Sequence, residues 1–204
     1  MQTKTINSKY TFTRKETSNG PTFYHFKSLD STNLEAERFA LSLNEEGLEK
    51  LKKGVVFVAD TQSNGQGSFA KQWISENGGL YYSLLIASDH LEVENTQYLV
   101  REFGQATATL LKEISNETVE LELPNDLIVG FRKIGGLLIK MCHVKTKPVL
   151  IIGIGINVNQ VDFPEKIQRA TTSLKLLTNR TINRSELIIN LTKKLLSTMR
   201  ANLS

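Results

Sequence analysis

Short apolar runs separated by polar turns predict several β-strands. Alternating or continuous apolar residues mark strands at 22–28, 55–59, 80–86, 119–123 and 149–156. The last run, VLIIGIGI, has no polar interruption, so we expect both of its faces to be buried. The first 20 residues are polar and irregular, which is typical of a frayed end or a short edge strand.

Periodic apolar positions predict helices at 34–43, 98–115, 173–177 and 185–199. The first follows Asp30-Ser31-Thr32-Asn33, a cluster of N-capping residues. A helix N-terminus of this kind also offers hydroxyls, an amide and free N–H groups to a polar ligand, although the spacing alone favours the cap. Strands and helices alternate without regular βαβ units, which predicts an α+β domain with a mixed sheet.

The stretch from 123 to 140, LPNDLIVGFRKIGGLLIK, predicts a β-hairpin. Pro124-Asn125-Asp126 is a turn signal before the first strand, and Gly130-Phe131 is a second turn. Gly135-Gly136 would weaken a strand, which suggests that backbone here lies close to another group. Lys133, beside this bare backbone, would suit a carboxylate or phosphate. The alternative is a plain surface lysine next to a glycine-containing strand.

A polar loop with spaced glycines follows the strand at 55–59. In residues 60–68, DTQSNGQGS, the glycines would bring backbone N–H groups close to an anion. Gly-x-Gly also makes ordinary turns, and the chain has neither a GxGxxG nor a P-loop motif. The single tryptophan, Trp73, is expected to pack at the edge of the core.

Composition and charge indicate one globular domain that binds neither nucleic acid nor membrane. The chain has 204 residues, 40% hydrophobic and 23% charged, with a formal charge of +4. Basic residues gather after 165 at helical spacing and predict a solvated helix face, although an acidic partner protein is left open. These residues are Lys166, Arg169, Lys175, Arg180, Arg184, Lys193, Lys194 and Arg200. One cysteine, Cys142, and the absence of a signal peptide or transmembrane run predict a cytoplasmic protein.

Taken in order, the motifs resemble the catalytic domain of biotin protein ligases over residues 22–200. The resemblance rests on DSTN at 30–33, Gln62 before the Gly-x-Gly loop, Trp73, PND at 124–126, Arg132-Lys133 with Gly136, and GIGINVN at 153–159. It implies the fold shared by biotin and lipoate ligases, a mixed β-sheet flanked by helices.

The family reaction that this resemblance implies has two steps. Biotin and ATP form biotinyl-5′-AMP with Mg²⁺, and the acyl group then passes to a lysine of a biotin carboxyl carrier domain. Joining a carboxylate to a phosphate requires fixed positive charge between them. Lys133 matches the family lysine that bridges the two anions, and is the catalytic candidate.

The remaining site residues are carried over from the family motifs. The biotin and adenylate side is matched by Ser31, Thr32, Asn33, Gln62, Gly65, Gln66, Gly67, Ser68, Gly136, Gly153, Gly155 and Asn157. The nucleotide and Mg²⁺ side is matched by Asn125, Asp126 and Arg132, with Asp126 as the candidate metal ligand. The glycines would let the backbone approach the ligand.

The chain departs from the family at its phosphate loop. Where the family reads Gly-Arg-Gly-Arg-x-Gly-Arg, Gln66 and Ser68 replace two arginines and Lys71 replaces a third. Glu122-Leu123 stands where the family has Lys-Trp. Losing guanidinium contacts to a phosphate should weaken adenylate retention by on the order of several kcal/mol in sum.

The domain organisation is an expectation, while the oligomeric state and the function stay open at this stage. We expect residues 1–204 to form one catalytic domain, without the DNA-binding domain of regulatory members or the small C-terminal barrel. The oligomeric state could be monomer or homodimer. A lipoate or octanoate ligase or transferase is an alternative, weakened by the absence of an Arg-Arg-x-x-Gly-Gly-Gly signature. A catalytically silent paralogue that binds biotin or a carrier domain is another, favoured by the depleted arginine loop.

Overall fold

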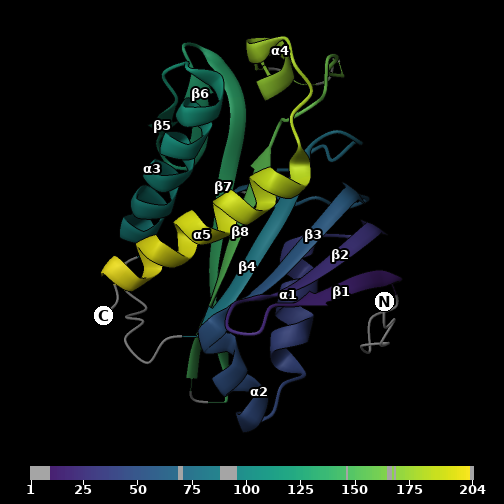
Figure 1. The fold of residues 1–204 in the computed structure, drawn as a ribbon, viewed down its shortest axis with the longest axis vertical. Coiled ribbons are helices and arrows are strands. Elements are labelled where there is room, and N and C mark those ends of the chain that lie inside the picture. Colours follow the sequence, from purple (N-terminus) through teal and green to yellow (C-terminus); the bar gives the residue numbers. More distant parts are fainter. Residues whose placement is uncertain are drawn as a thin grey trace.

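One eight-stranded mixed sheet forms the centre of the fold (Figure 1). The structure is a computed structural model that describes residues 10–202 except 69–70, 88–95, 146, 165–166 and 168. The strand order is β1-β2-β3-β4-β8-β7-β6-β5. β2 and β3 are parallel, and the other neighbouring pairs are antiparallel. The predicted α+β class with a mixed sheet is confirmed.

The elements follow the sequence pattern closely. The strands are β1 Phe12–Glu16, β2 Thr22–Leu29, β3 Val55–Gln62, β4 Leu80–Ala87, β5 Glu120–Glu122, β6 Asp126–Val129, β7 Arg132–Val144 and β8 Lys147–Ile156. The helices are α1 Thr32–Leu41, α2 Glu45–Lys50, α3 Thr96–Ser115, α4 Leu174–Thr178 and α5 Arg184–Asn202, with a 3₁₀ turn at Leu51–Lys53. Of the two predictions for the N-terminal region, the short edge strand is confirmed, because β1 lies at one edge of the sheet. Predictions that fall on residues 1–9, 69–70 and Lys166 lie outside the described residues.

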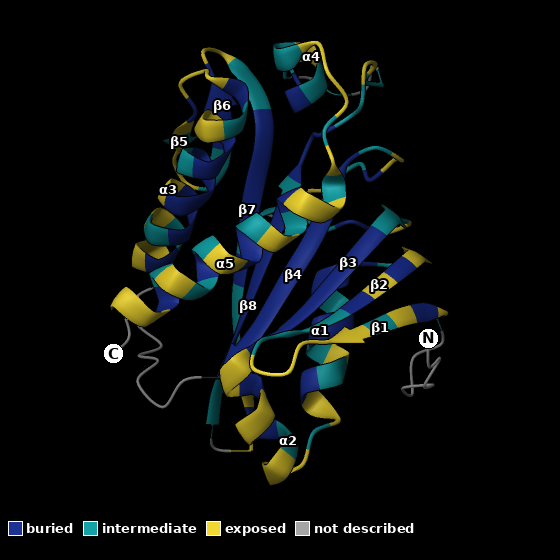
Figure 2. Ribbon diagram, viewed as in Figure 1, coloured by how far each residue is buried: buried dark blue, intermediate teal, exposed yellow. Residues whose placement is uncertain are grey.

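Helices cover both faces of the sheet and enclose two hydrophobic cores (Figures 1 and 2). α3 and α5 pack on one face, and α1 and α2 pack on the other. Successive residues of β4 alternate between them, with Leu84 in the first core and Leu85 in the second. The middle strands are consequently buried on both faces, as predicted for β8 (Figure 2).

The predicted hairpin is confirmed as β6 and β7. Gly130 takes a φ of +58° at the turn, a conformation that favours glycine, and Phe131 beside it is 76% exposed. The pairing sets Asp126 opposite Gly136 and shifts register between Leu127 and Ile128. β7 then pairs with β8, so Gly136 lies opposite Gly155.

The segment after 165 differs from the prediction of a helical face. Arg169 lies in a bend rather than on a helix, so the solvated-face interpretation is wrong for this residue. The segment runs beside the start of β7, where the Lys133 N–H donates to Ala170 O and the Thr172 N–H donates to Lys133 O, both at 2.9 Å. Lys193 and Arg200 do lie exposed on α5, as predicted.

α2 is an element that the sequence pattern missed. Its six residues, EEGLEK, contain a single buried apolar side chain, Leu48, so no helical period was visible. Asn44 caps it by accepting a hydrogen bond from the Gly47 N–H. Within the described residues, no helix is long and apolar enough to cross a membrane.

Candidate functional site

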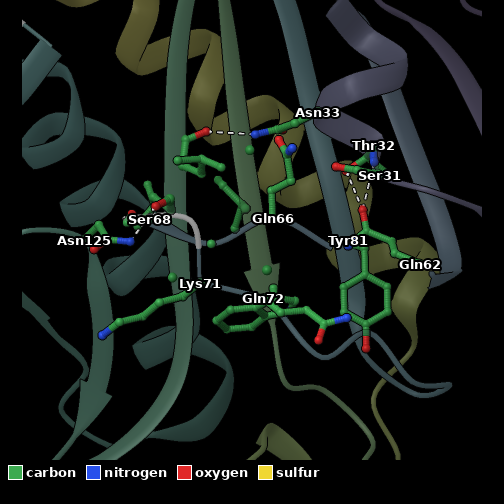
Figure 3. A pocket seen from close by; sticks show the side chains of 18 of the residues that line it. Ser31, Thr32, Asn33, Gln62, Gln66, Ser68, Lys71, Gln72, Tyr81 and Asn125 are labelled. Carbon is green, nitrogen blue, oxygen red and sulfur yellow. Dashed lines mark hydrogen bonds between the residues drawn. The ribbon is translucent and has the colours of Figure 1, made fainter. Parts of the chain in front are cut away.

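A cavity of about 240 Å³ opens beside the ends of β3, β4, β7 and β8 (Figure 3). It collects polar side chains from segments that are far apart in sequence. Its walls are Ser31, Thr32, Asn33, Gln62, Gln66, Gly67, Ser68, Lys71, Gln72, Trp73, Tyr81, Tyr82, Pro124, Asn125, Asp126, Lys133, Gly136, Leu137, Leu138, Gly153, Ile154 and Gly155. Concave sites with convergent polar groups are where small ligands bind.

The end of the cavity near α1 is a preorganised hydrogen-bond network. Gln62 Oε1 accepts from the Thr32 N–H at 2.8 Å and lies 3.2 Å from Thr32 Oγ1. Its Nε2 donates to Ser75 Oγ at 2.8 Å, and this hydroxyl donates to Trp73 O. Both ends of the Gln62 amide are therefore oriented before any ligand arrives. Figure 3 shows the end that bonds to Thr32. Ser75 was not predicted from the sequence.

Asn33 is held over the sheet by a second network. Its Nδ2 donates to Leu138 O at 3.2 Å, and its Oδ1 accepts from Ser83 Oγ at 2.5 Å. Gly153 leaves the room for this amide, because a Cβ there would lie 2.3 Å from Asn33 Oδ1. Ser83 is fully buried, and its only signal in the sequence is that it is the one serine within the run LYYSLLI.

The predicted helix cap is only partly correct. Ser31 occupies the N-cap position of α1, but its side chain makes no capping hydrogen bond to the described residues and lines the cavity instead. Asp30 Oδ1 accepts from the Ser31 N–H at 2.7 Å. Arg38 in turn donates to Asp30 and to the buried Glu35, which fixes the segment that presents Ser31 and Thr32.

Trp73 is a wall of the cavity rather than part of the core edge, so that prediction is wrong. The loop folds back on itself, with the Trp73 N–H donating to Gly65 O at 2.9 Å and an isolated bridge between Gln66 and Gln72. Gly65 allows this close approach, since a Cβ there would lie 2.3 Å from Trp73 O. The indole covers Gly155, and its buried Nε1 has no hydrogen-bond partner among the described residues.

Lys133 brings positive charge to the cavity wall. Its Nζ lies 2.6 Å from Asp126 Oδ1 and 5.0 Å from the centre of the Trp73 ring, within cation–π range. The side chain is 24% exposed. The plain-surface alternative does not describe a lysine in these contacts.

Arg169 is a charged partner of the site that sequence reasoning missed. Its NH1 lies 2.9 Å from Asp126 Oδ2 and 2.6 Å from Glu122 Oε2. The hydrogen bond that Arg169 donates to Glu122 is the main cause of both the lowered pKa of Glu122 and the raised pKa of Arg169. Each oxygen of the Asp126 carboxylate thus has its own cation. The acidic Glu122, one of the departures from the family pattern, contacts one of these two cations.

Most of the residues predicted for the site meet in this cavity. Those brought together are Ser31, Thr32, Asn33, Gln62, Gln66, Gly67, Ser68, Asn125, Asp126, Lys133, Gly136, Gly153 and Gly155. In the described part of the chain, Gly65, Arg132 and Asn157 do not line it. Asn157 is buried behind it, where its Nδ2 donates to Thr172 O at 3.1 Å. The ligand-facing roles assigned to all these residues stay predictions.

The glycines of β8 serve protein contacts in this structure. Asn33 fills the space over Gly153, and Trp73 fills the space over Gly155. Tyr81 and Tyr82, which were not predicted as site residues, complete the wall beside them. Burial raises the pKa of both phenols above the ordinary value for tyrosine.

Comparison with known proteins places this arrangement in a family. A sequence model of the Biotin/lipoate A/B protein ligase family matches residues 26–157. The "Bifunctional ligase/repressor BirA" of Bacillus subtilis is 31% identical over 140 residues, covering 67% of this chain and 43% of that protein. "Biotin--protein ligase 2" of Arabidopsis thaliana is 32% identical over 113 residues, covering 52% of this chain and 33% of that protein. The chain thus spans less than half the length of these curated relatives.

Solved structures agree with the sequence comparison. The biotin protein ligase from Aquifex aeolicus, in complex with biotin and ATP, is 31% identical with a TM-score of 0.73, over 89% of this chain and 71% of that one. A biotin protein ligase from Leishmania major in complex with biotinyl-5-AMP has a TM-score of 0.72 at 22% identity and supports the fold alone; it covers 89% of this chain and 75% of that one. Together with the family match over more than half of the sequence, these findings show that the chain belongs to the biotin/lipoate A/B protein ligase family.

Proposed function

We propose that this protein is a biotin protein ligase, which forms biotinyl-5′-AMP from biotin and ATP and passes the biotin to a lysine of a biotin carboxyl carrier domain. The observation that carries the proposal is the placement of the Lys133 ammonium in the wall of a polar cavity, 2.6 Å from a carboxylate. The similarity to biotin protein ligases supports the choice of biotin.

The network near α1 suits the ureido ring of biotin. Such a ring presents two N–H donors and one carbonyl acceptor, and it needs partners when it is buried. Thr32, Asn33 and Gln62 provide hydroxyl and amide groups whose orientations are fixed by Ser75, Ser83 and the backbone. Ser31 adds a hydroxyl that is not used for capping α1.

Lys133 would act by exchanging one anion for another. The carboxylate of biotin attacks the α-phosphorus of ATP, a carboxylate–phosphate bond forms, and pyrophosphate leaves. Negative charge accumulates where the two groups meet, so an ammonium already positioned there lowers the barrier. Asp126 holds Lys133 in place beforehand, and Arg169 remains on the second oxygen of Asp126 when Lys133 turns to the ligand.

The residues of the cavity fit a Mg²⁺ ion that arrives with the nucleotide. Among the described residues, no three His, Cys, Asp or Glu side chains cluster as metal ligands. Mg²⁺ in nucleotide sites typically takes one or two carboxylates and completes its shell with water and phosphate oxygens. Asp126 could provide one such carboxylate, and the ion would supply further charge neutralisation at the phosphates.

The wider assignments form part of the same proposal. The protein would act in the cytoplasm on a carrier domain, as a monomer or a homodimer, without binding nucleic acid or membrane. The matched region in these relatives supports the ligase chemistry rather than any particular carrier or assembly.

One experiment tests the proposal against its alternatives. The protein is incubated with ATP and Mg²⁺ together with biotin, lipoate or octanoate, and acyl-AMP is measured by mass spectrometry. Biotinyl-AMP as the main product supports the proposal. A preference for octanoyl-AMP or lipoyl-AMP would move the function to a lipoate-type ligase. Biotin binding without any acyl-AMP would indicate the catalytically silent paralogue, an alternative that the missing arginines of the loop favour.

A further inference from the structure

A lysine outside the predicted site reaches the arginine-depleted loop. Lys140 Nζ donates to Gln66 Oε1 at 2.9 Å, and Gln66 is one of the residues that line the cavity. Figure 3 shows Gln66 rising from the loop between the group of Thr32 and Gln62 on one side and Ser68 and Asn125 on the other. A neutral amide at this place is thus bound to an ammonium.

The strand geometry directs Lys140 to the same face as the cavity. Side chains of a strand alternate, so Lys140 shares a face of β7 with Gly136 and Leu138, both of which line the cavity. One two-residue repeat separates Lys140 from Leu138, about 7 Å. Its side chain is 34% exposed, and Oε2 of the Glu37 carboxylate on α1 lies 3.9 Å from its Nζ, farther than the amide oxygen of Gln66.

The contact with Gln66 is one that an anion can displace. An ammonium attracts an anionic oxygen more strongly than the neutral oxygen of an amide. Gln66, the hydrogen-bond partner that would be left behind, carries no charge, and the carboxylate of Glu37 lies 3.9 Å from the ammonium. Lys133 differs in this respect, because its present partner is the carboxylate of Asp126. Lys140 can therefore turn to a ligand without separating an ion pair as close as that one.

We propose that Lys140 is an anion-binding residue of this cavity, and that it supplies from β7 the positive charge that the 65–68 loop lacks. Its ligand is the oxyanion of an acyl-adenylate. In the free protein the Lys140 ammonium donates a hydrogen bond to the amide oxygen of Gln66. In the complex the anionic oxygen of the ligand replaces that amide oxygen. The inference rests on the proposed function, because it takes its ligand from there.

Two ligands of the same shape distinguish a charge contact from a structural one. The first is a non-hydrolysable phosphonate analogue of biotinyl-AMP, which is anionic, and the second is a neutral analogue with an amide link in place of the phosphate. Calorimetry gives the Kd of each for the unmodified protein and for Lys140→Gln, Lys140→Arg and the surface control Lys50→Gln, whose lysine is 75% exposed on α2. Thermal melts verify that every variant is folded.

We expect Lys140→Gln to weaken the anionic analogue about tenfold or more, and the neutral analogue by less than about twofold. Lys140→Arg and Lys50→Gln should retain tight binding of the anionic analogue. Equal weakening of both analogues by Lys140→Gln would mean that the lysine only holds the loop, and would overturn the inference. Unchanged binding of the anionic analogue would overturn it as well.

A double variant tests where the charge is needed. Gln66→Arg alone would place a guanidinium against the Lys140 ammonium, so it should not improve binding of the anionic analogue. Gln66→Arg combined with Lys140→Gln should recover much of the lost affinity, since one cation again faces the ligand. The absence of any such recovery counts against the inference.

The same binding measurements distinguish failure of the inference from failure of the proposed function. If the unmodified protein binds neither analogue, the proposed function is refuted, and the inference falls with it. If the unmodified protein binds both and Lys140→Gln binds both equally well, the proposed function stands and the role of Lys140 is refuted.

Discussion

Replacing Lys133 with alanine should lower the free energy of unfolding only slightly but slow adenylate formation strongly. In the folded protein the ammonium contacts Asp126, and both side chains are only about a quarter exposed or less. Removing one member of a buried ion pair usually costs about 3–5 kcal/mol, because the other charge is left unpaired. Asp126 is not left unpaired here, since Arg169 stays on its second oxygen at 2.9 Å. We therefore expect a loss of about 1 kcal/mol in the free energy of unfolding, at the upper end of what a more exposed pair contributes.

The effect on the reaction should be much larger. An ammonium that contacts both the carboxylate and the phosphate makes two charge-assisted hydrogen bonds, each about 1.5–3 kcal/mol. Their loss in the transition state amounts to about 3–6 kcal/mol, which slows adenylate formation about 10²- to 10⁴-fold. Single-turnover formation of biotinyl-AMP, followed by mass spectrometry, measures the rate, and urea unfolding measures the stability.

The reasoning has two points at which it can fail. A rate within about tenfold of the unmodified protein would mean that Lys133 does not contact the reacting anions. A stability loss well above 3 kcal/mol would mean that Arg169 does not compensate Asp126. Lys193→Ala is the matched control, because this lysine lies exposed on α5, and it should leave both measurements unchanged.

Three further predictions follow from contacts of the site. Arg169→Gln should raise the pKa of Glu122 toward its ordinary value, as measured by NMR titration, because Arg169 is the main cause of its lowered pKa. A carboxyl group with a lowered pKa stabilises the folded protein at pH values above the pKa that it has in the unfolded chain. This stabilisation is lost as the pH falls through the pKa of the folded state. The part of the stability difference between the two proteins that comes from Glu122 should therefore shrink below about pH 4.5. Gly155→Ala should destabilise the protein by about 1–3 kcal/mol in thermal unfolding, because the new Cβ would lie 2.6 Å from Trp73; an unchanged melting temperature would show that the indole moves aside freely. Biotin should bind in calorimetry without ATP and more tightly than octanoate, through the polar network near α1, and the reverse order would contradict that use of the network.

The local pattern of the sequence was sufficient for most of the fold. The hairpin of β6 and β7 was predictable because its turn residues and apolar runs are neighbours in the chain, and β8 because its whole run is apolar. Residues 31–33 and Gln62 were identified as a group only through a resemblance that supplied their order. Nothing local in the sequence shows that Gln62 accepts from Thr32, since that contact joins the start of α1 to the end of β3.

The errors concern side chains whose surroundings come from distant segments. Trp73 looked like a core residue because large aromatic side chains are usually buried in cores, but the fold of its loop places it over the glycine of another strand. Arg169 was grouped with helical lysines by its spacing, while its partners lie on β5 and β6. Lys140 was not predicted as a site residue, because its contact with Gln66 joins β7 to a loop 74 residues earlier in the chain.

The backbone contacts of Lys133 with Ala170 and Thr172 also bear on when the site can form. A ribosome releases the strand that carries the lysine well before it releases the segment that pairs with it. The hydrogen bond from Asn157 Nδ2 to Thr172 O likewise cannot form before this segment has been synthesised. A nascent chain that has completed the polar network near α1 would still lack the support for its charged end. Under the proposed function, activation of an acid through Lys133 would thus begin only after residues 170–172 have been synthesised, which keeps a reactive acyl-phosphate away from a half-folded chain and its own exposed lysines.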